Sequence, residues 1–428
     1  MPTEDELYRS SSQYRLWNFT PQNLASLRQK TNERAKKNVL NALKRKRETG
    51  SAVPESHGSG TPANGGSGTP ATGNGTPANR NIGADGYPEI DFLTVEEELV
   101  LIDFFCSQLM SMMEQSPFTE RYNNTIAATA VQYMRRFYLT NSVMSYHPKS
   151  IMITALYIAQ KSEGAHATAT EFVTSLTSVP GLENTTLEEL LAPEYIIIQG
   201  LRFCFDVRHP TRGLKGAKLE LEVLLDLVRG DEAPKSWKGG IEGQIRRHLS
   251  DKYGAPNKFR ERCEKAYYTA RDRLQGSAVL SDAYFLYTPS QIMLAALWLA
   301  DSAIAQDLVV SKLSVVPPPP ASRLPADQRD KPTVDRILDE IEACAEVLQR
   351  TAVSASKKEA ARVDRKLKYC SNPDKVDLVR MNAATKRGGT ADGAVEEGVA
   401  KKRRLAREKA EREGEDLFGG ALVKKEED

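Results

Sequence analysis

The chain has 428 residues, of which 40% are hydrophobic, and its 59 Lys and Arg residues against 57 Asp and Glu residues leave a net charge of only +2. No run of ~18 apolar residues is present, so no membrane-spanning helix is expected, and the first residues lack the apolar core of a signal peptide. The 5 scattered cysteines form no C-x-x-C pair. We therefore expect no zinc site, no other metal and no cofactor.

Residues 1–48 are expected to form a helical, basic segment at the amino end. Thr20 followed by Pro21 is typical of a helix start, with threonine as the cap and proline at the first helical position. From residue 28 to residue 47 the chain is strongly basic, with Glu33 as the single acidic residue. The densest part of this run is Lys44, Arg45, Lys46 and Arg47. The run fits a nuclear address or an acidic partner, and it also fits the solvated face of a helix.

Residues 49–88 are rich in Gly, Ser, Thr, Pro, Asn and Ala, and they repeat the tetrapeptide Gly-Thr-Pro-Ala at 60–63, 68–71 and 75–78. A segment of this composition cannot bury enough apolar surface to fold. We predict a disordered linker that tethers the amino-terminal helix.

Residues 89–209 are predicted to form a first helical domain. Thr94, with Glu97 three residues later, is typical of a capping box at a helix start. Apolar residues at helical spacing predict the other helices. These helices span residues 120–139, 149–161, 170–176 and 193–203. Residues 187–191 are expected to form a separate turn, because Pro193 cannot continue a helix from upstream without a kink.

Residues 210–350 are predicted to form a second helical domain, followed by a charged end over 351–428. The predicted helices of this domain span residues 214–228, 257–274, 288–303 and 334–349. Two loops, 229–256 and 314–332, are expected to interrupt it. Beyond it, residues 354–369 predict a basic helix, and the composition after Asn372 predicts disorder. A second nuclear-signal candidate is Lys401, Lys402, Arg403 and Arg404.

Enzyme motifs are missing from the sequence. It contains no G-x-x-x-x-G-K-[ST], no H-E-x-x-H and no G-x-S-x-G pattern, which are the arrangements that cradle phosphates, hold a catalytic zinc ion or present a serine nucleophile. We expect no catalytic residues, and a protein that is not an enzyme.

Several segments resemble the cyclin family. Residues 133–137, YMRRF, resemble the motif of the second helix of a cyclin box, and residues 155–163, ALYIAQKSE, resemble its third helix. Residues 11–19, 141–148 and 280–292 are similar to the cyclins that serve general transcription factor IIH. The resemblance implies an all-α fold of two tandem five-helix cyclin boxes, with extra helices at both ends.

The same resemblance implies a function. The chain would be a non-catalytic regulatory subunit that binds and activates a cyclin-dependent kinase. A RING-finger assembly factor and the remainder of general transcription factor IIH would be further partners. The complex would phosphorylate the carboxy-terminal repeats of RNA polymerase II in the nucleus. Two other interpretations stay open: a cyclin C-like transcriptional cyclin, and a cyclin-fold transcription factor that binds nucleic acid.

The resemblance also implies where the kinase binds. Lys161, at the end of the third helix, and Glu194, at the start of the fifth, would contact the kinase main chain. Ile158 and Ile198 lie one helical turn from them on the same faces and would supply an apolar floor. The alternative is a surface salt bridge beside two core isoleucines.

Overall fold

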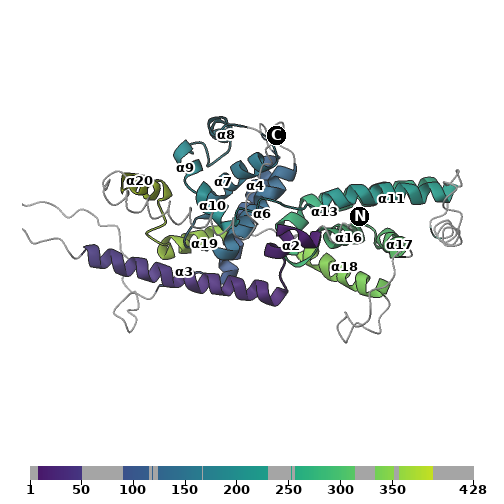
Figure 1. Cartoon of the computed structure of the whole chain (residues 1–428), viewed down its shortest axis with the longest axis horizontal. Helices are drawn as coiled ribbons and strands as arrows, with labels where there is room; N and C mark the ends of the chain where they lie inside the picture. Colours follow the sequence, from purple (N-terminus) through teal and green to yellow (C-terminus); the bar gives the residue numbers. More distant parts are fainter. Residues whose placement is uncertain are drawn as a thin grey trace, which may run out of the picture. The chain divides into compact units, whose positions relative to one another are not determined.

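The computed structural model of the chain describes residues 8–50, 90–114, 118, 124–165, 167–229, 252, 256–313, 333–350 and 356–388 (Figure 1). Within these ranges every regular element is a helix, as the all-α prediction requires. The chain divides into two units, residues 1–376 and residues 377–428. The predicted linker lies almost entirely outside the described residues.

The helices of the first unit begin with two at the amino end and those of the first box. They are α2 (Ser12–Trp17), α3 (Pro21–Gly50), α4 (Val95–Met113), α6 (Asn124–Thr140), α7 (Pro148–Ser162), α8 (Ala169–Leu176), α9 (Leu187–Leu191) and α10 (Glu194–Gly200). The second box and its extension contribute α11 (Thr211–Arg229), α13 (Pro256–Gln275), α14 (Ser277–Leu280), α15 (Ala283–Leu286), α16 (Pro289–Ala300), α17 (Ser302–Leu313), α18 (Thr333–Arg350) and α19 (Lys357–Cys370).

The first box is built around α6 and α7, whose described side chains are buried along most of both helices. The α7 helix can be apolar on nearly all sides because α4, α6, α9 and α10 pack against it. His147 caps α7, since its Nδ1 accepts the N–H of Lys149 at 3.1 Å, and Pro148 occupies the first helical position. The predicted capping box of α4 is confirmed, with Thr94 and Glu97 bonded reciprocally at 3.2 and 3.1 Å.

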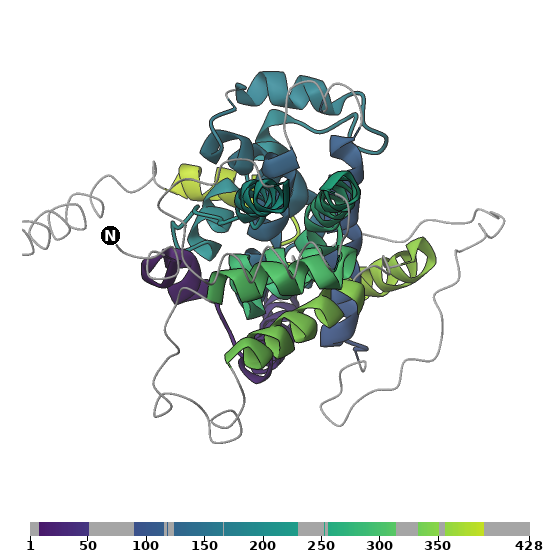
Figure 2. The same cartoon turned by 90° about the vertical axis from the view of Figure 1, so that its right-hand side faces the viewer.

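The second box packs α11, α13, α16 and α18 around one core, and its green and yellow-green helices face the viewer in Figure 2. Its buried members include Leu214, Phe259, Leu297 and Leu348. The predicted helix over 288–303 is wrong at its end. Asp301 adopts an extended conformation (φ −159°, ψ 99°) and separates α16 from α17, because its carboxylate accepts the N–H of Ile304 at 3.2 Å and so caps the next helix.

Two further predictions need correction. Disorder beyond Asn372 is wrong for the described residues up to 388, where α20 (Leu378–Gly388) begins after Asp377, whose carboxylate accepts the N–H of Arg380 at 2.8 Å. The rest of the predicted disordered tail lies outside the described residues. The helix predicted over 193–203 begins at Glu194, with Pro193 as its cap residue, and ends at Gly200. Beyond its end, Arg202 and Phe203 adopt positive φ angles of 53° and 58°, which no α-helix contains.

The amino-terminal helix α3 packs on the first box. Its Thr31 hydroxyl donates to the carbonyl of Leu139 at 2.8 Å. The Asn32 amide donates to the carbonyl of Leu93 at 3.0 Å and to the carboxylate of Glu98 at 2.6 Å. Burial raises the pKa of Glu98, which is 7% exposed. Buried side-chain hydrogen bonds therefore fix where α3 lies, in addition to its apolar face.

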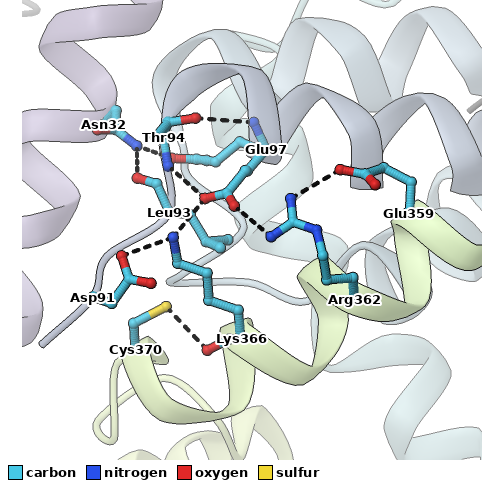
Figure 3. Close-up of polar contacts among 10 residues, drawn as sticks. Asn32, Asp91, Leu93, Thr94, Glu97, Glu359, Arg362, Lys366 and Cys370 are labelled. Atoms are coloured by element: carbon cyan, nitrogen blue, oxygen red, sulfur yellow. Dashed lines mark hydrogen bonds and ion pairs between the residues drawn. The ribbon is translucent and has the colours of Figure 1, made fainter.

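The predicted basic helix near the carboxy end is confirmed as α19, and it packs against α4 (Figure 3). Lys366 Nζ lies 2.8 Å from the carboxylates of both Asp91 and Glu97, and Arg362 lies 3.1 Å from Glu97. Burial would raise the pKa of Glu97, but hydrogen bonds from Lys366 and from the N–H of Thr94 hold it below its ordinary value. Glu97 thus caps α4 and anchors α19 at the same time.

A buried arginine of α6 joins α3 and the two boxes. The Arg135 side chain is 5% exposed and lies 2.6 Å from Asp103 of α4 and 2.7 Å from Asp282, just before α15. Arg28 of α3 binds the same Asp282 carboxylate through two hydrogen bonds of 2.7 and 2.6 Å. Burial would raise the pKa of Asp282, but the hydrogen bond from Arg28 and the charge of Arg135 hold it well below its usual range.

The short helix α2, which the sequence analysis did not predict, closes the same junction. Trp17 is 2% exposed and packs with Leu24, Leu139 and Phe285. The guanidinium carbons of Arg136 and Arg202 lie 5.3 and 5.6 Å from its ring centroid. The N–H of Phe19 donates to the carbonyl of Phe285 at 2.7 Å.

A chain of hydrogen bonds through His209 also crosses the junction of the boxes. Thr129 donates its hydroxyl proton to Glu163 at 2.6 Å, so it accepts the Nε2–H of His209 at 2.8 Å. His209 Nδ1 then accepts the hydroxyl proton of Tyr284 at 3.0 Å. Burial, with the nearby charge of Arg136, lowers the pKa of His209 to about 4. The neutral ring is the form that these bonds require.

The free energy of unfolding is expected to fall in acid because of His209. The pKa of His209 is about 4 in the folded chain and ~6.5 when unfolded, so below pH ~6.5 the unfolded chain binds a proton that the folded chain does not. The contribution of His209 to the free energy of unfolding is fully present above pH ~6.5 and is lost as the pH falls toward 4. At pH 4.5 the free energy of unfolding should be lower by about 2–3 kcal/mol because of this group. Urea unfolding at pH 7 and at pH 4.5 measures the difference. The pH-dependent loss should be smaller in His209→Gln, and an equal loss in both proteins would contradict the assignment.

Candidate functional site

The structure brings Lys161 and Glu194 together. The α7 helix ends at Ser162, and Gly164 follows with φ 75°, a conformation that favours glycine. Glu194 opens α10, where its carboxylate contacts the Lys161 ammonium. The ammonium also lies 4.4 Å from the ring centroid of Tyr157 on the preceding turn. The side chains of Lys161 and Glu194 are 42% and 25% exposed, so both remain accessible to a partner.

The two isoleucines of the predicted floor differ in exposure. Ile158 is 3% exposed and belongs to the core of the box, whereas Ile198 is partly buried. Exposed apolar surface is instead contributed by three residues spaced four apart, Leu187, Leu191 and Tyr195, at 41%, 38% and 63% exposure. Ile158 therefore offers little surface to a partner in the free chain, whereas Leu187, Leu191 and Tyr195 are accessible.

The exposed residues are held in place by α7. The hydroxyl of Thr154 in α7 donates to the carbonyl of Leu190 at 2.7 Å, and Leu190 is itself buried. The α9 helix begins with a capping box in which Thr186 and Glu189 bond reciprocally. Because α9 and α10 follow each other with only a turn between them, Leu191 lies close to Tyr195 and Glu194 in the chain.

The nuclear-signal candidates fall partly outside the described residues. Lys44, Arg45 and Lys46 are exposed on α3, and Arg45 lies 2.6 Å from Asp374. The side chain of Arg47 and the cluster over 401–404 are not among the described residues. The described ranges contain no group of His, Cys, Asp and Glu side chains arranged to hold a metal ion. No helix in the same ranges is long and apolar enough to cross a membrane.

The described chain contains two helical domains in tandem, and two helix ends face each other in the first, at Lys161 and Glu194. The model of the cyclin amino-terminal domain matches residues 100–206, and that of the cyclin carboxy-terminal domain matches residues 209–349. The chain belongs to the cyclin family.

Within the family, the chain is similar to H-type cyclins. It is 27% identical to cyclin CCL1 of Saccharomyces cerevisiae over 72% of this chain, although the match spans only 62% of that relative. It is 26% identical to cyclin-H1-1 of Arabidopsis thaliana, over 85% of this chain and 88% of the relative. A chain in the solved CAK complex of Chaetomium thermophilum, bound to ATP-γ-S, is 28% identical. That comparison has a TM-score of 0.62 and covers 92% of this chain and 98% of the other.

Proposed function

We propose that this chain is the regulatory subunit that binds and activates the cyclin-dependent kinase of general transcription factor IIH. One observation carries the proposal: the Lys161–Glu194 pair joins the ends of α7 and α10 and stays accessible, and the exposed residues Leu191 and Tyr195 lie within three positions of Glu194 in the chain. Membership of the cyclin family and the similarity to a chain of a CAK complex support it.

The arrangement suits the task of activating a kinase. A kinase becomes active when its C helix moves inward, so that a lysine–glutamate pair can position the nucleotide phosphates. The surface proposed here would hold that helix by apolar contact with Leu191, Tyr195 and Ile198. Lys161 would donate hydrogen bonds to the kinase main chain, and Glu194 would accept them. Nucleotide, magnesium and phosphoryl transfer would belong to the kinase.

The proposal extends to the wider complex. A RING-finger assembly factor and the rest of general transcription factor IIH would complete it, and its substrate would be the carboxy-terminal repeats of RNA polymerase II in the nucleus. The test is to mix the purified chain with the cognate kinase and a polymerase-tail peptide. Phosphorylation should rise well above that of the kinase alone and should be absent with the chain alone. No rise would overturn the proposal.

Changing Lys161 to alanine is expected to weaken kinase binding roughly ten- to hundredfold, because a charge-assisted hydrogen bond is worth about 1.5–3 kcal/mol where a partner excludes water. The free protein should melt almost unchanged, since an exposed ion pair contributes ~0–1 kcal/mol. Ile198→Asp should weaken kinase binding more than Lys161→Ala does, because it adds an unpaired charge to the apolar surface.

The measurement is a titration of kinase against each variant. Lys149→Ala is the matched control, because Lys149 is exposed at the opposite end of the same helix. If Lys161→Ala binds the kinase as tightly as the wild type, Lys161 is not part of the interface. A much earlier melt of that variant would instead mean that the ion pair serves the fold.

A further inference from the structure

A cavity of about 120 Å³ lies between the two boxes, on a different part of the first box from the Lys161–Glu194 pair. The start of α6, the start of α11 and the end of α13 form its walls. The lining residues with polar side-chain groups are His209, Asn124, Thr125, Thr211, Lys215, Arg271, Gln275, Tyr267 and Tyr284. Both ring nitrogens of His209 already have hydrogen-bond partners, as described above, so the other polar groups are the ones that face a ligand.

The charge of the lining favours an anion. Lys215 and Arg271 are cations, and no described residue of the lining is acidic. Arg271 lies 3.2 Å from Asp272, but these side chains are 42% and 68% exposed, and so exposed a pair is weak and easily exchanged. Thr211 is the first residue of the 19-residue helix α11, whose N–H groups and dipole add positive potential at the same end.

Next to the cavity, α11 and α13 carry exposed apolar side chains. Leu219 follows Lys215 by one helical turn and is 63% exposed, and Tyr268 precedes Arg271 by about one turn and is 48% exposed. The two helices pack together, and Lys218 Nζ lies 5.1 Å from the ring centroid of Tyr267. Along their helices, Leu219 lies about one turn, ~5–6 Å, from Lys215, and Tyr268 lies about one turn from Arg271, whose guanidinium carbon is 5.0 Å from the Tyr268 ring centroid. We call the exposed side chains of Leu219 and Tyr268 the apolar shelf. An extended peptide covers that distance in about two residues.

We propose that this cavity and shelf bind a phosphorylated peptide segment of a partner protein. The phosphoryl group of a phosphoserine or phosphothreonine would enter the cavity between Lys215 and Arg271 and accept hydrogen bonds from the hydroxyls of Thr125 and Thr211. An apolar side chain two residues away would lie on Leu219 and Tyr268. A peptide fits better than a nucleic acid, because the cavity takes one phosphoryl group and the adjoining shelf is apolar.

The test uses the full chain alone, without kinase, so its outcome is independent of the activating function. The probe is a fluorescein-labelled peptide with the sequence Leu-Gly-phosphothreonine-Gly-Leu, followed by fluorescence anisotropy. It is expected to bind at least tenfold more tightly than its unphosphorylated twin. It should also bind severalfold more tightly than a version in which alanine replaces both leucines.

Variants test whether the cations of the cavity select the phosphoryl group and whether the apolar shelf selects the leucine side chain. The double variant Lys215→Gln with Arg271→Gln should abolish the preference for phosphate, and Lys215→Gln alone, at an exposed position, should reduce it. Leu219→Ser should abolish only the preference for leucine. Lys265→Gln is the control, because Lys265 is exposed on α13 and outside the cavity lining. Melting curves verify that each variant folds.

Three outcomes would overturn the proposal. The first is equal affinity for the phosphorylated and unphosphorylated peptides. The second is an unchanged phosphate preference in both Lys215 variants. The third is displacement of the peptide by an oligonucleotide of equal charge as effectively as by the unlabelled phosphopeptide, which would make the surface a general polyanion site.

Discussion

Replacing Arg135 by leucine is expected to lower the free energy of unfolding by about 3–5 kcal/mol, because removing one member of a buried ion network leaves charge without compensation. The guanidinium is almost completely buried and neutralises carboxylates from both boxes. Asp103 is 39% exposed and can be hydrated after the change, but Asp282 would depend on Arg28 alone.

Urea unfolding followed by circular dichroism measures this effect. Arg365→Leu is the control, since Arg365 is exposed on α19 and its loss should change stability by less than ~0.5 kcal/mol. A loss of under ~1 kcal/mol in the single variant would show that the network is not needed for stability.

Trp17→Ala is expected to cost about 3–5 kcal/mol, the range for removing a large aromatic side chain from a packed interior. The indole packs against Leu24, Leu139 and Phe285, and its loss should also release α2. Cleavage by trypsin after Arg15 should therefore become faster. Trp17→Phe should lose less, since much of the ring remains, and Gln22→Ala, at an exposed position of α3, should change neither measurement. Unchanged proteolysis of Trp17→Ala would mean that other contacts hold α2.

The sequence predicted those features of the fold that depend on residues within one helix. Apolar spacing identified the main helices of both boxes, and the Thr94–Glu97 and Thr20–Pro21 patterns marked two helix starts correctly. These features depend on neighbours three or four residues apart, so a linear pattern contains them. The positions of Lys161 and Glu194 came from the cyclin resemblance. Their pairing across 33 residues is visible only in the fold, and their role in kinase binding stays a prediction.

Features that depend on distant partners could not be predicted in this way. Arg135 and Asp282 are 147 residues apart, and no local pattern links them. Ile158 was assigned to a partner surface because it lies on the same helical face as Lys161. Other helices cover α7 so fully that the residue is 3% exposed in this chain, and its role in kinase binding stays a prediction. The α17 helix was missed for a local reason: the capping role of Asp301 interrupts an apolar pattern that continues on both sides.

The α19 anchor described above has a consequence for synthesis on the ribosome. Glu97 of the first box is bound by Lys366, which lies 269 residues later in the chain. At ~5–20 residues per second, on the order of 15–50 s pass between the synthesis of Glu97 and that of Lys366. During that interval the face of α4 that α19 covers is exposed to solvent and to other proteins. Cellular factors that bind nascent apolar surfaces would therefore meet this face of the first box before the chain itself can cover it.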